Sequence, residues 1–330
     1  MTRIDVTTGS RLHFGLICGS PSTAWRFGGI GVMLRQPGWQ LSVDNGPADD
    51  DRISASTAVE LRIREFLQRI RKTLPCGPLQ IHVTGSVPFH TGLGGGTQLG
   101  LALAAAAELL TNRRLGEDPF QLAECTGRAE RSAIGTIGFV QGGFLVDHGH
   151  EMSGSTNRRV DRHQFPEAWR FVLVRPTDSE GISGHREQTF FARHRNMPRK
   201  LVAELESQIL EGIVPSIDRL QFSKFAESVE HYGISVGRFY SAEQGGVFSH
   251  PAMIQLASLL RAEGVFGMAQ SSWGPCIAIP AESHDHATQI AGRIPESTAN
   301  CHLNISIAEA MNNGASIRTP HDDSWMRPFQ

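Results

Sequence analysis

The sequence predicts an α+β protein with two domains. Segments with strand and helix character alternate along the chain, but without the regular β-α-β period that a doubly wound sheet requires. A run rich in Ala and Leu, residues 99–110, follows a glycine-rich segment directly and has high helix propensity. Residues 148–166 are polar and poor in large apolar side chains. We therefore expect a domain boundary there, between residues 1–155 and 156–330.

In the first half, alternating apolar residues predict strands over residues 3–17, 31–43 and 79–83. Val59, Ile63, Phe66 and Ile70 recur every three to four residues, which predicts a helix over residues 55–74. Helices over residues 99–110 and 119–131 and a strand over 142–147 follow. The second half predicts strands over 171–174, 274–279, 305–307 and 315–318, and helices over 200–211, 221–239, 251–262 and 285–294. The tail from residue 319 is expected to be loose.

Composition argues against several classes of protein. Of 330 residues, 40% are hydrophobic and 19% charged, with a formal net charge of −2, which speaks against a nucleic-acid partner and against wholesale disorder. The five cysteines are scattered and form no CxxC pair, as in a reducing compartment. No apolar leader follows the N-terminus, and residues 99–110 are too short to span a bilayer. We expect a cytoplasmic protein without membrane partners.

The glycine-rich segment is the strongest functional signal. Gly92, Gly94, Gly95 and Gly96 precede the predicted helix. Glycine lets the backbone approach a ligand, and a helix N-terminus offers unpaired N–H groups, so together they suit phosphate or diphosphate. Thr97 can cap the helix or bind the anion. No Lys-Ser/Thr follows, and the spacing does not fit G-x-G-x-x-G, so neither a P-loop nor a dinucleotide fingerprint is present. The alternative is an ordinary turn before a helix.

Residues 87–98 resemble the central P-x-x-x-G-L-G-S-S-S-A signature of the GHMP kinases, whose loop holds nucleotide phosphates. Gly95, Gly96, Thr97 and Gln98 stand where that signature has serines and alanine. The wider pattern resembles one branch, the β-ribofuranosylaminobenzene 5′-phosphate synthases of methanopterin biosynthesis. The matching segments are residues 11–16, 26–31, 90–98, 127–128, 131–136, 142–147, Gly184 with Glu187, 244–246 and 270–275.

This resemblance implies a two-domain GHMP-kinase-like fold, a homodimer and a specific transfer reaction. In that reaction 5-phosphoribosyl 1-diphosphate and 4-aminobenzoate, or 4-hydroxybenzoate, give a C-riboside 5′-phosphate, CO2 and diphosphate. Mg²⁺ bound to the diphosphate is the expected activator of the leaving group. The enzyme must hold both phosphate groups, orient a flat ring and keep water away from a cationic ribose.

These requirements select the candidate residues. Arg11 and Arg26 can bind phosphate oxygens in bidentate fashion, and His13 is an acid–base or orienting group for the ring substituent. Asp147 or Glu130 would help to place magnesium. The expected catalytic residues are His13, Arg26 and Asp147, and the expected substrate-binding residues are Arg11, Gly92, Gly94, Gly95, Gly96, Thr97, Gln98, Glu130, Arg131, Ser271, Ser272 and Trp273.

Structural alternatives exist for several of these residues. His13 can be a structural histidine at a strand end, Asp147 can shape a turn, and Trp273 can belong to the core. Two other functions also remain: an ATP-dependent small-molecule kinase, and a non-catalytic module that binds a phosphorylated ligand. Residues 133–139, where GHMP kinases commonly carry an acidic base, contain no Asp or Glu, which disfavours the kinase.

Overall fold

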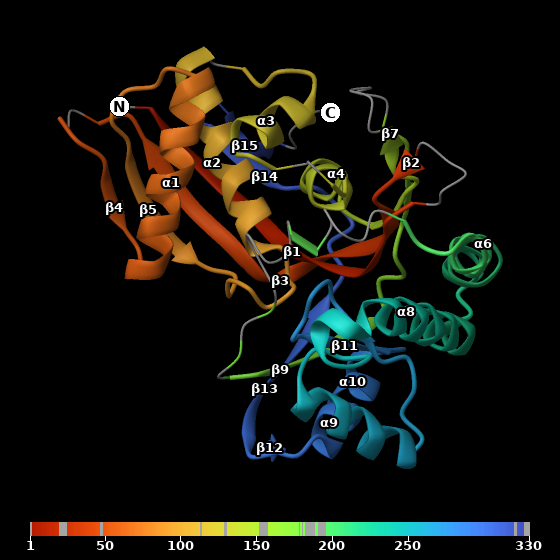
Figure 1. The fold of residues 1–330 in the computed structure, drawn as a ribbon. Helices are drawn as coiled ribbons and strands as arrows, with labels where there is room; N and C mark the ends of the chain where they lie inside the picture. Colours follow the sequence, from red (N-terminus) through yellow and green to blue (C-terminus); the bar gives the residue numbers. More distant parts are fainter. Residues whose placement is uncertain are drawn as a thin grey trace.

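Two β-sheets organise the computed structural model of the chain (Figure 1). It describes residues 2–19, 25–46, 49–112, 114–128, 131–151, 158–177, 179, 181, 189–190, 196–319 and 322–326. Within these residues, the larger sheet has eight strands and the smaller has five, and a short pair lies beside them. That pair is β2 (Trp25–Arg26) with β7 (His150–Glu151).

The larger sheet is built around one long antiparallel hairpin, β1 with β3, whose register runs from Arg3↔Asp44 to Ile17↔Gly28. Its order is β15-β14-β1-β3-β5-β4, with β6 paired to β3 and β8 paired to β6. Helices α1 to α4 pack against this sheet and one another. The strands are β1 (Arg3–Ile17), β3 (Gly28–Asp44), β4 (Arg52–Ser54), β5 (Gln80–Gly85), β6 (Phe144–Asp147), β8 (Val160–His163), β14 (Ser316–Thr319) and β15 (Asp322–Met326). The helices are α1 (Thr57–Thr73), α2 (Gly95–Asn112), α3 (Pro119–Cys125) and α4 (Ile134–Gln141).

The smaller sheet has the order β10-β11-β9-β13-β12 and is covered by α9 and α10. Helix α8 contacts both β1 and β10, so it lies where the two sheets meet (Figure 1). The strands are β9 (Arg170–Pro176), β10 (Ala269–Gln270), β11 (Ile277–Ala281), β12 (Ser297–Thr298) and β13 (Cys301–Glu309). The helices are α6 (Arg199–Ser207), the π-helix η1 (Gln208–Ile213), α7 (Val214–Asp218), α8 (Phe222–Gln244), α9 (Pro251–Ala262) and α10 (His284–Arg293).

The main hydrophobic core is continuous between the two sheets. Phe14 on β1 lies 6.2 Å, ring to ring, from Phe171 on β9, and Phe165 stacks on Phe171 at 5.4 Å. All three rings are fully buried. Burying an aromatic side chain stabilises a fold by roughly 1.5–3 kcal/mol. The two sheets are therefore tied together by packing, and this fixes the loops between them.

The α+β class is confirmed, and most predicted elements are present within a few residues of their expected limits. Three details differ. Helix α2 begins at Gly95, inside the glycine segment, and α3 ends at Cys125 because Gly127 has a positive φ of 69°. Residues 322–326 are not a loose tail but a strand paired with β14.

Helix α4 also occupies residues for which the sequence analysis predicted no element. The domain boundary at residue 155 stays a prediction. Three strands beyond it, β8, β14 and β15, pair within the larger sheet, so that sheet contains residues from both predicted domains. No helix in the described part of the chain has both the length and the apolar character needed to cross a membrane.

Candidate active site

Three segments that are far apart in the sequence meet at the middle of β1. Ser271 Oγ accepts a hydrogen bond from the backbone N–H of His13 at 3.0 Å and donates to the carbonyl of Gly92 at 2.8 Å. The backbone N–H of Ser272 donates to the carbonyl of His13 at 2.7 Å. Arg11 Nη1 donates to the carbonyl of Gly92 at 3.0 Å. The predicted strand, glycine segment and 271–275 segment therefore form one site.

His13, Ser132 and Asp147 form a buried hydrogen-bonded chain. His13 Nε2 lies 3.2 Å from Ser132 Oγ, and Ser132 Oγ donates to Asp147 Oδ2 at 3.1 Å. The backbone N–H groups of Ala133 and Gly149 donate to the same carboxylate at 2.6 and 2.9 Å. Because the only hydroxyl proton of Ser132 points to Asp147, the histidine must donate from Nε2 to Ser132. This leaves Nδ1 of His13 as a hydrogen-bond acceptor.

Burial controls the charge states of His13 and Asp147. Desolvation lowers the pKa of His13 from 6.5 to about 3, and the nearby charge of Arg11 acts in the same direction. The imidazole is therefore neutral at any ordinary working pH. Desolvation also raises the pKa of Asp147, against the three donors that favour its ionised form. His13 can donate and accept hydrogen bonds here as a neutral ring, but it does not act as a cation.

The glycines of the loop are required by close contacts. Gly92 and Gly94 have φ values of 85° and 69°, which side-chain-bearing residues rarely adopt. A Cβ on Gly92 would lie 2.2 Å from the carbonyl oxygen of Ser271, and one on Gly94 would lie 2.7 Å from Cγ of Arg11. These two glycines let the loop lie directly against β1 and the 271–275 segment.

Two arginines that the sequence analysis did not select lie beside the start of α2. A Cβ on Gly96 would lie 2.9 Å from Nη2 of Arg128 and 3.9 Å from Nη2 of Arg62. Both guanidinium groups also contact the ring of Phe66, at 5.4 and 4.8 Å from its centroid. A helix N-terminus flanked by two guanidinium groups has the charge and the donors to hold a diphosphate.

Two further arginines, Arg26 and Arg158, lie near His150. Arg26 on β2 pairs in register with His150 on β7. Burial and, to a smaller extent, the charge of Arg158 together lower the pKa of His150 to about 4. Arg158 Nη1 also donates to the carbonyl of Arg131 at 3.2 Å, next to Ser132 in the chain. Arg11 acts on the charge of His13 and Arg158 on that of Asp147, so both ends of this hydrogen-bonded series lie near a cationic group.

Not every predicted residue is placed to touch a ligand. The side chain of Gln98 is fully buried, where it accepts from Thr8 Oγ1 at 2.7 Å and donates to the carbonyl of Gly135 at 2.8 Å. Trp273 is only 7% exposed and packs against Phe190 and Tyr240, with ring centroids 5.1 and 5.0 Å away. These contacts favour structural roles for both residues.

The other predicted residues differ in where the structure places them. Thr97 lies half-buried in the first turn of α2, where its N–H donates to the carbonyl of Gly94 at 3.1 Å. Gly95 is buried against Val87 rather than facing the arginines. Glu130 lies outside the described residues. Within the described chain, no group of three or more His, Cys, Asp or Glu residues is arranged to hold a metal ion.

Known protein families match both halves of the chain. The model for the GHMP kinases N terminal domain matches residues 61–143, and that for the GHMP kinases C terminal matches residues 237–300. The chain belongs to the GHMP kinase superfamily. The first match includes the glycine segment, Arg128 and Ser132, and the second includes the 271–275 segment. Arg11, His13 and Asp147 lie outside both matched ranges, so the two family models cover only part of the site described above.

Within the superfamily, the chain is most informatively compared with two curated relatives. It is 29% identical over 313 residues to the β-ribofuranosylphenol 5′-phosphate synthase of Methanothermobacter thermautotrophicus, covering 88% of this chain and 92% of that protein. It is 25% identical over 252 residues to the synthase of the same name from Methanocaldococcus jannaschii, covering 68% and 75%.

Solved structures confirm the GHMP-kinase-like fold. A putative homoserine kinase from Listeria monocytogenes superposes with a TM-score of 0.66 at 16% identity, covering 96% of this chain and 99% of that chain. Mevalonate diphosphate decarboxylase from Staphylococcus aureus gives 0.61 at 16% identity, covering 96% and 98%. At such identities the likeness concerns the fold alone.

Proposed function

We propose that this chain is a synthase that joins 5-phosphoribosyl 1-diphosphate to 4-hydroxybenzoate or 4-aminobenzoate, releasing CO2 and diphosphate, in methanopterin biosynthesis. The observation that carries the proposal is the similarity to β-ribofuranosylphenol 5′-phosphate synthase over 92% of that protein's length. The name of these relatives specifies a phenol product, which favours 4-hydroxybenzoate as the aromatic substrate.

The arginines beside α2 suit the leaving group. As the bond from C1 of the ribose to diphosphate breaks, negative charge grows on diphosphate and positive charge on the ribose ring. Arg62, Arg128 and the N–H groups at the start of α2 are positioned to stabilise that negative charge. Mg²⁺ is expected to arrive with the diphosphate. Asp147 does not fit as a ligand of that ion, because its carboxylate already accepts three hydrogen bonds.

We assign His13 to the para substituent of the aromatic acid. Its neutral ring has Nδ1 available as an acceptor, so it can bind the hydroxyl or amino N–H and increase electron donation into the ring. The ring carbon that bears the carboxylate then bonds to C1 of the ribose. The C–CO2 bond breaks next, its electron pair restores the aromatic ring, and CO2 leaves. Ser132 and Asp147 hold the imidazole in this tautomer.

The kinase alternative is less well supported by the same geometry. A kinase needs a carboxylate that can accept the proton of the substrate hydroxyl. Among the described residues that form this cluster, Asp147 is the only carboxylate, and three donors already occupy it. The synthase needs no such base, since its nucleophile is an electron-rich ring.

The deciding experiment uses carboxyl-labelled 4-hydroxybenzoate and, in parallel, carboxyl-labelled 4-aminobenzoate. Each is incubated with the purified protein, phosphoribosyl diphosphate and Mg²⁺, and released CO2 is trapped. We expect release that requires phosphoribosyl diphosphate, needs no ATP and is faster with 4-hydroxybenzoate.

A Ser132→Ala variant tests whether the proposed site carries out the reaction. It should fold normally and release CO2 at least ~10-fold more slowly, because His13 loses the group that fixes its tautomer. If neither acid releases CO2, the synthase proposal is wrong. ATP-dependent phosphorylation should then be tested, along with ligand binding without turnover.

A further inference from the structure

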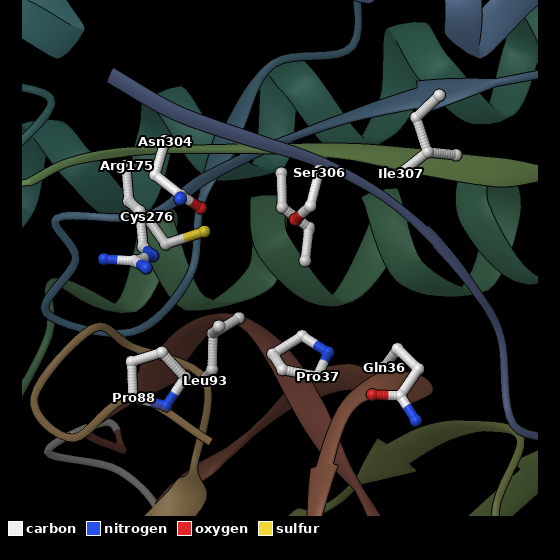
Figure 2. Close-up of a pocket in the computed structure, with 10 residues that line it drawn as sticks. Gln36, Pro37, Pro88, Leu93, Arg175, Cys276, Asn304, Ser306 and Ile307 are labelled. Atoms are coloured by element: carbon white, nitrogen blue, oxygen red, sulfur yellow. The ribbon is translucent and has the colours of Figure 1, made fainter. Parts of the chain in front are cut away.

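A cavity of about 270 Å³ lies on the other side of the glycine segment, between the two sheets. Its upper side in Figure 2 is formed by residues of β9 and β13 and by Cys276, and its lower side by Gln36 and Pro37 of β3 together with Pro88 and Leu93. None of His13, Ser132 or Asp147 lines it. The function proposed above therefore leaves this cavity unexplained.

The lining of the cavity combines one positive charge with apolar walls. Arg175 and Asn304 are a cross-strand pair, and Leu173 faces Ser306 two residues further along. Figure 2 shows Arg175, Asn304 and Cys276 gathered at one end. Of the ten residues that line the cavity, only Arg175 is charged. Pro37, Pro88, Leu93, Leu173 and Ile307 supply the apolar surface.

The guanidinium of Arg175 has no protein partner within the described chain. It is half-buried, yet no hydrogen bond or ion pair joins it to another described residue. Its charge is close enough to Cys276 to act against the effect of burial, which raises the pKa of that thiol to about 12. A partly desolvated cation with no counter-ion among the described residues favours an anionic ligand, and the planar fork of arginine fits a carboxylate.

We propose that this cavity binds a small carboxylic acid with an apolar body, at a site separate from the catalytic cluster. The carboxylate would pair with Arg175, and the amide of Asn304 and the hydroxyl of Ser306 add polar contacts. The prolines and leucines would cover the apolar body. The cavity is slightly smaller than the roughly 300–1,000 Å³ that holds drug-sized ligands, so the acid must be compact.

An acid bound there would influence the phosphate loop. Leu93 lines the cavity, and its carbonyl accepts a hydrogen bond from the backbone N–H of Arg11 at 2.9 Å. Cys276, on the opposite side, donates its N–H to the carbonyl of Thr91 at 3.3 Å. A ligand in contact with both residues therefore touches the glycine segment itself and a residue that holds it in place. We expect its binding to change the KM for phosphoribosyl diphosphate.

The test is calorimetry with benzoate, which has a carboxylate and an apolar ring but no para substituent. Wild-type protein should bind it, and Arg175→Gln should weaken binding at least ~10-fold, as expected for loss of a charge-assisted hydrogen bond. Arg175→Lys should bind with intermediate affinity. Arg52→Gln, which removes an exposed arginine on β4, is the matched control and should bind like the wild type.

A second comparison separates this cavity from the catalytic cluster. Ser132→Ala should bind benzoate with wild-type affinity, and Arg175→Gln should keep the wild-type kcat when no benzoate is present. Wild-type affinity in Arg175→Gln, or lost affinity in Ser132→Ala, would overturn the proposal, as would no binding of benzoate at millimolar concentration. The binding measurements do not depend on turnover, so their outcome tests the cavity separately from the proposed reaction.

Kinetics with 4-hydroxybenzoate identify the source of the acid. Inhibition at high 4-hydroxybenzoate that disappears in Arg175→Gln would mean that the aromatic substrate itself fills the cavity. Benzoate binding without such inhibition would assign the cavity to another acid of the same chemistry. A loss of kcat in Arg175→Gln at saturating substrates would instead place the cavity in the catalytic site and contradict a separate site.

Discussion

A single buried histidine links the candidate site to the stability of the fold. The folded protein holds His13 neutral with a pKa of about 3, whereas the ordinary value is 6.5. Between these values the unfolded chain binds more protons, so stability falls as the pH falls from 6.5 towards 3 and is complete above 6.5. The contribution of His13 alone should be about 2 kcal/mol smaller at pH 5 than at pH 7.5.

Denaturant unfolding at pH 7.5 and pH 5 measures this difference. His13→Gln should lose less stability than the wild type on acidification, because glutamine has no proton to gain. Burial also lowers the pKa of His150, so part of the dependence of the unfolding free energy on pH, the pH slope, should remain. His82→Gln, at an exposed position on β5, is the control and should keep the wild-type slope. A His13→Gln protein with the full wild-type slope would contradict the buried neutral imidazole.

Arg26 gives the second prediction for a single residue. It lies at the pairing of β2 with β7, opposite His150. If it contacts a substrate anion, Arg26→Ala should reduce kcat/KM at least ~10-fold, as for one charge-assisted contact worth about 1.5–3 kcal/mol. The CO2-release assay measures this, and exposed Arg52→Ala is the control. Unchanged turnover in Arg26→Ala would remove this residue from the site.

Single residues also show what sequence reasoning found and missed. Arg11, His13 and the glycines stood out because they lie in or beside a recognisable motif. Arg62 and Ser132 did not, because a helix residue and a serine carry no signal of their own until the fold brings them together. Phe66, four residues after Arg62 on one helix face, served only to predict the helix. Gln98 was overestimated because a buried amide and a ligand-binding amide look alike in sequence.

At the scale of elements, one substitution at the start of α2 should change helix stability and ligand binding in opposite directions. Gly96→Ala should stabilise the helix by up to about 1 kcal/mol, since alanine is the better helix former. The new methyl group would lie 2.9 Å from Nη2 of Arg128, so that side chain must move. We therefore expect weaker binding of phosphoribosyl diphosphate in calorimetry together with unchanged or higher stability in thermal unfolding.

A second helical glycine provides the matched comparison. Gly292 on α10 has no atom within 4 Å of where its Cβ would lie. Gly292→Ala should gain similar stability and bind phosphoribosyl diphosphate like the wild type. Normal binding in Gly96→Ala would show that the anion lies elsewhere. Gly95 is not suited to this test, because its Cβ would lie 2.9 Å from Val87 in the core.

The elements that sequence reasoning missed share a physical cause. Helix α4 is short, and most of its residues are buried, so apolar side chains lie all around it and no amphipathic period marks it. Strand β15 was missed because it pairs only with β14, at the edge of the larger sheet. Long elements with one buried face, such as α1 and β1, were predicted within a few residues.

At the scale of the whole molecule, Ser271 joins the two halves. Its hydroxyl bonds both β1 and the glycine segment from a position near the smaller sheet. Ser271→Ala leaves the N–H of His13 and the carbonyl of Gly92 without this partner, so unfolding should cost about 1–3 kcal/mol less. We also expect a higher KM for phosphoribosyl diphosphate.

Urea unfolding and steady-state kinetics measure the two effects. Ser258→Ala, which removes an exposed hydroxyl that bonds only within α9, is the control and should change neither. Lower stability with an unchanged KM would show that Ser271 stabilises the fold without positioning the loop.

The pairing of β1 with β14 has a consequence for how the protein is made. Val6 lies opposite Ile317, so β1 leaves the ribosome long before the strand with which it pairs. Until then β1 presents an open row of N–H and C=O groups along that edge. The nascent chain must therefore protect this edge throughout translation, and premature termination yields products with an exposed strand that can pair with other chains.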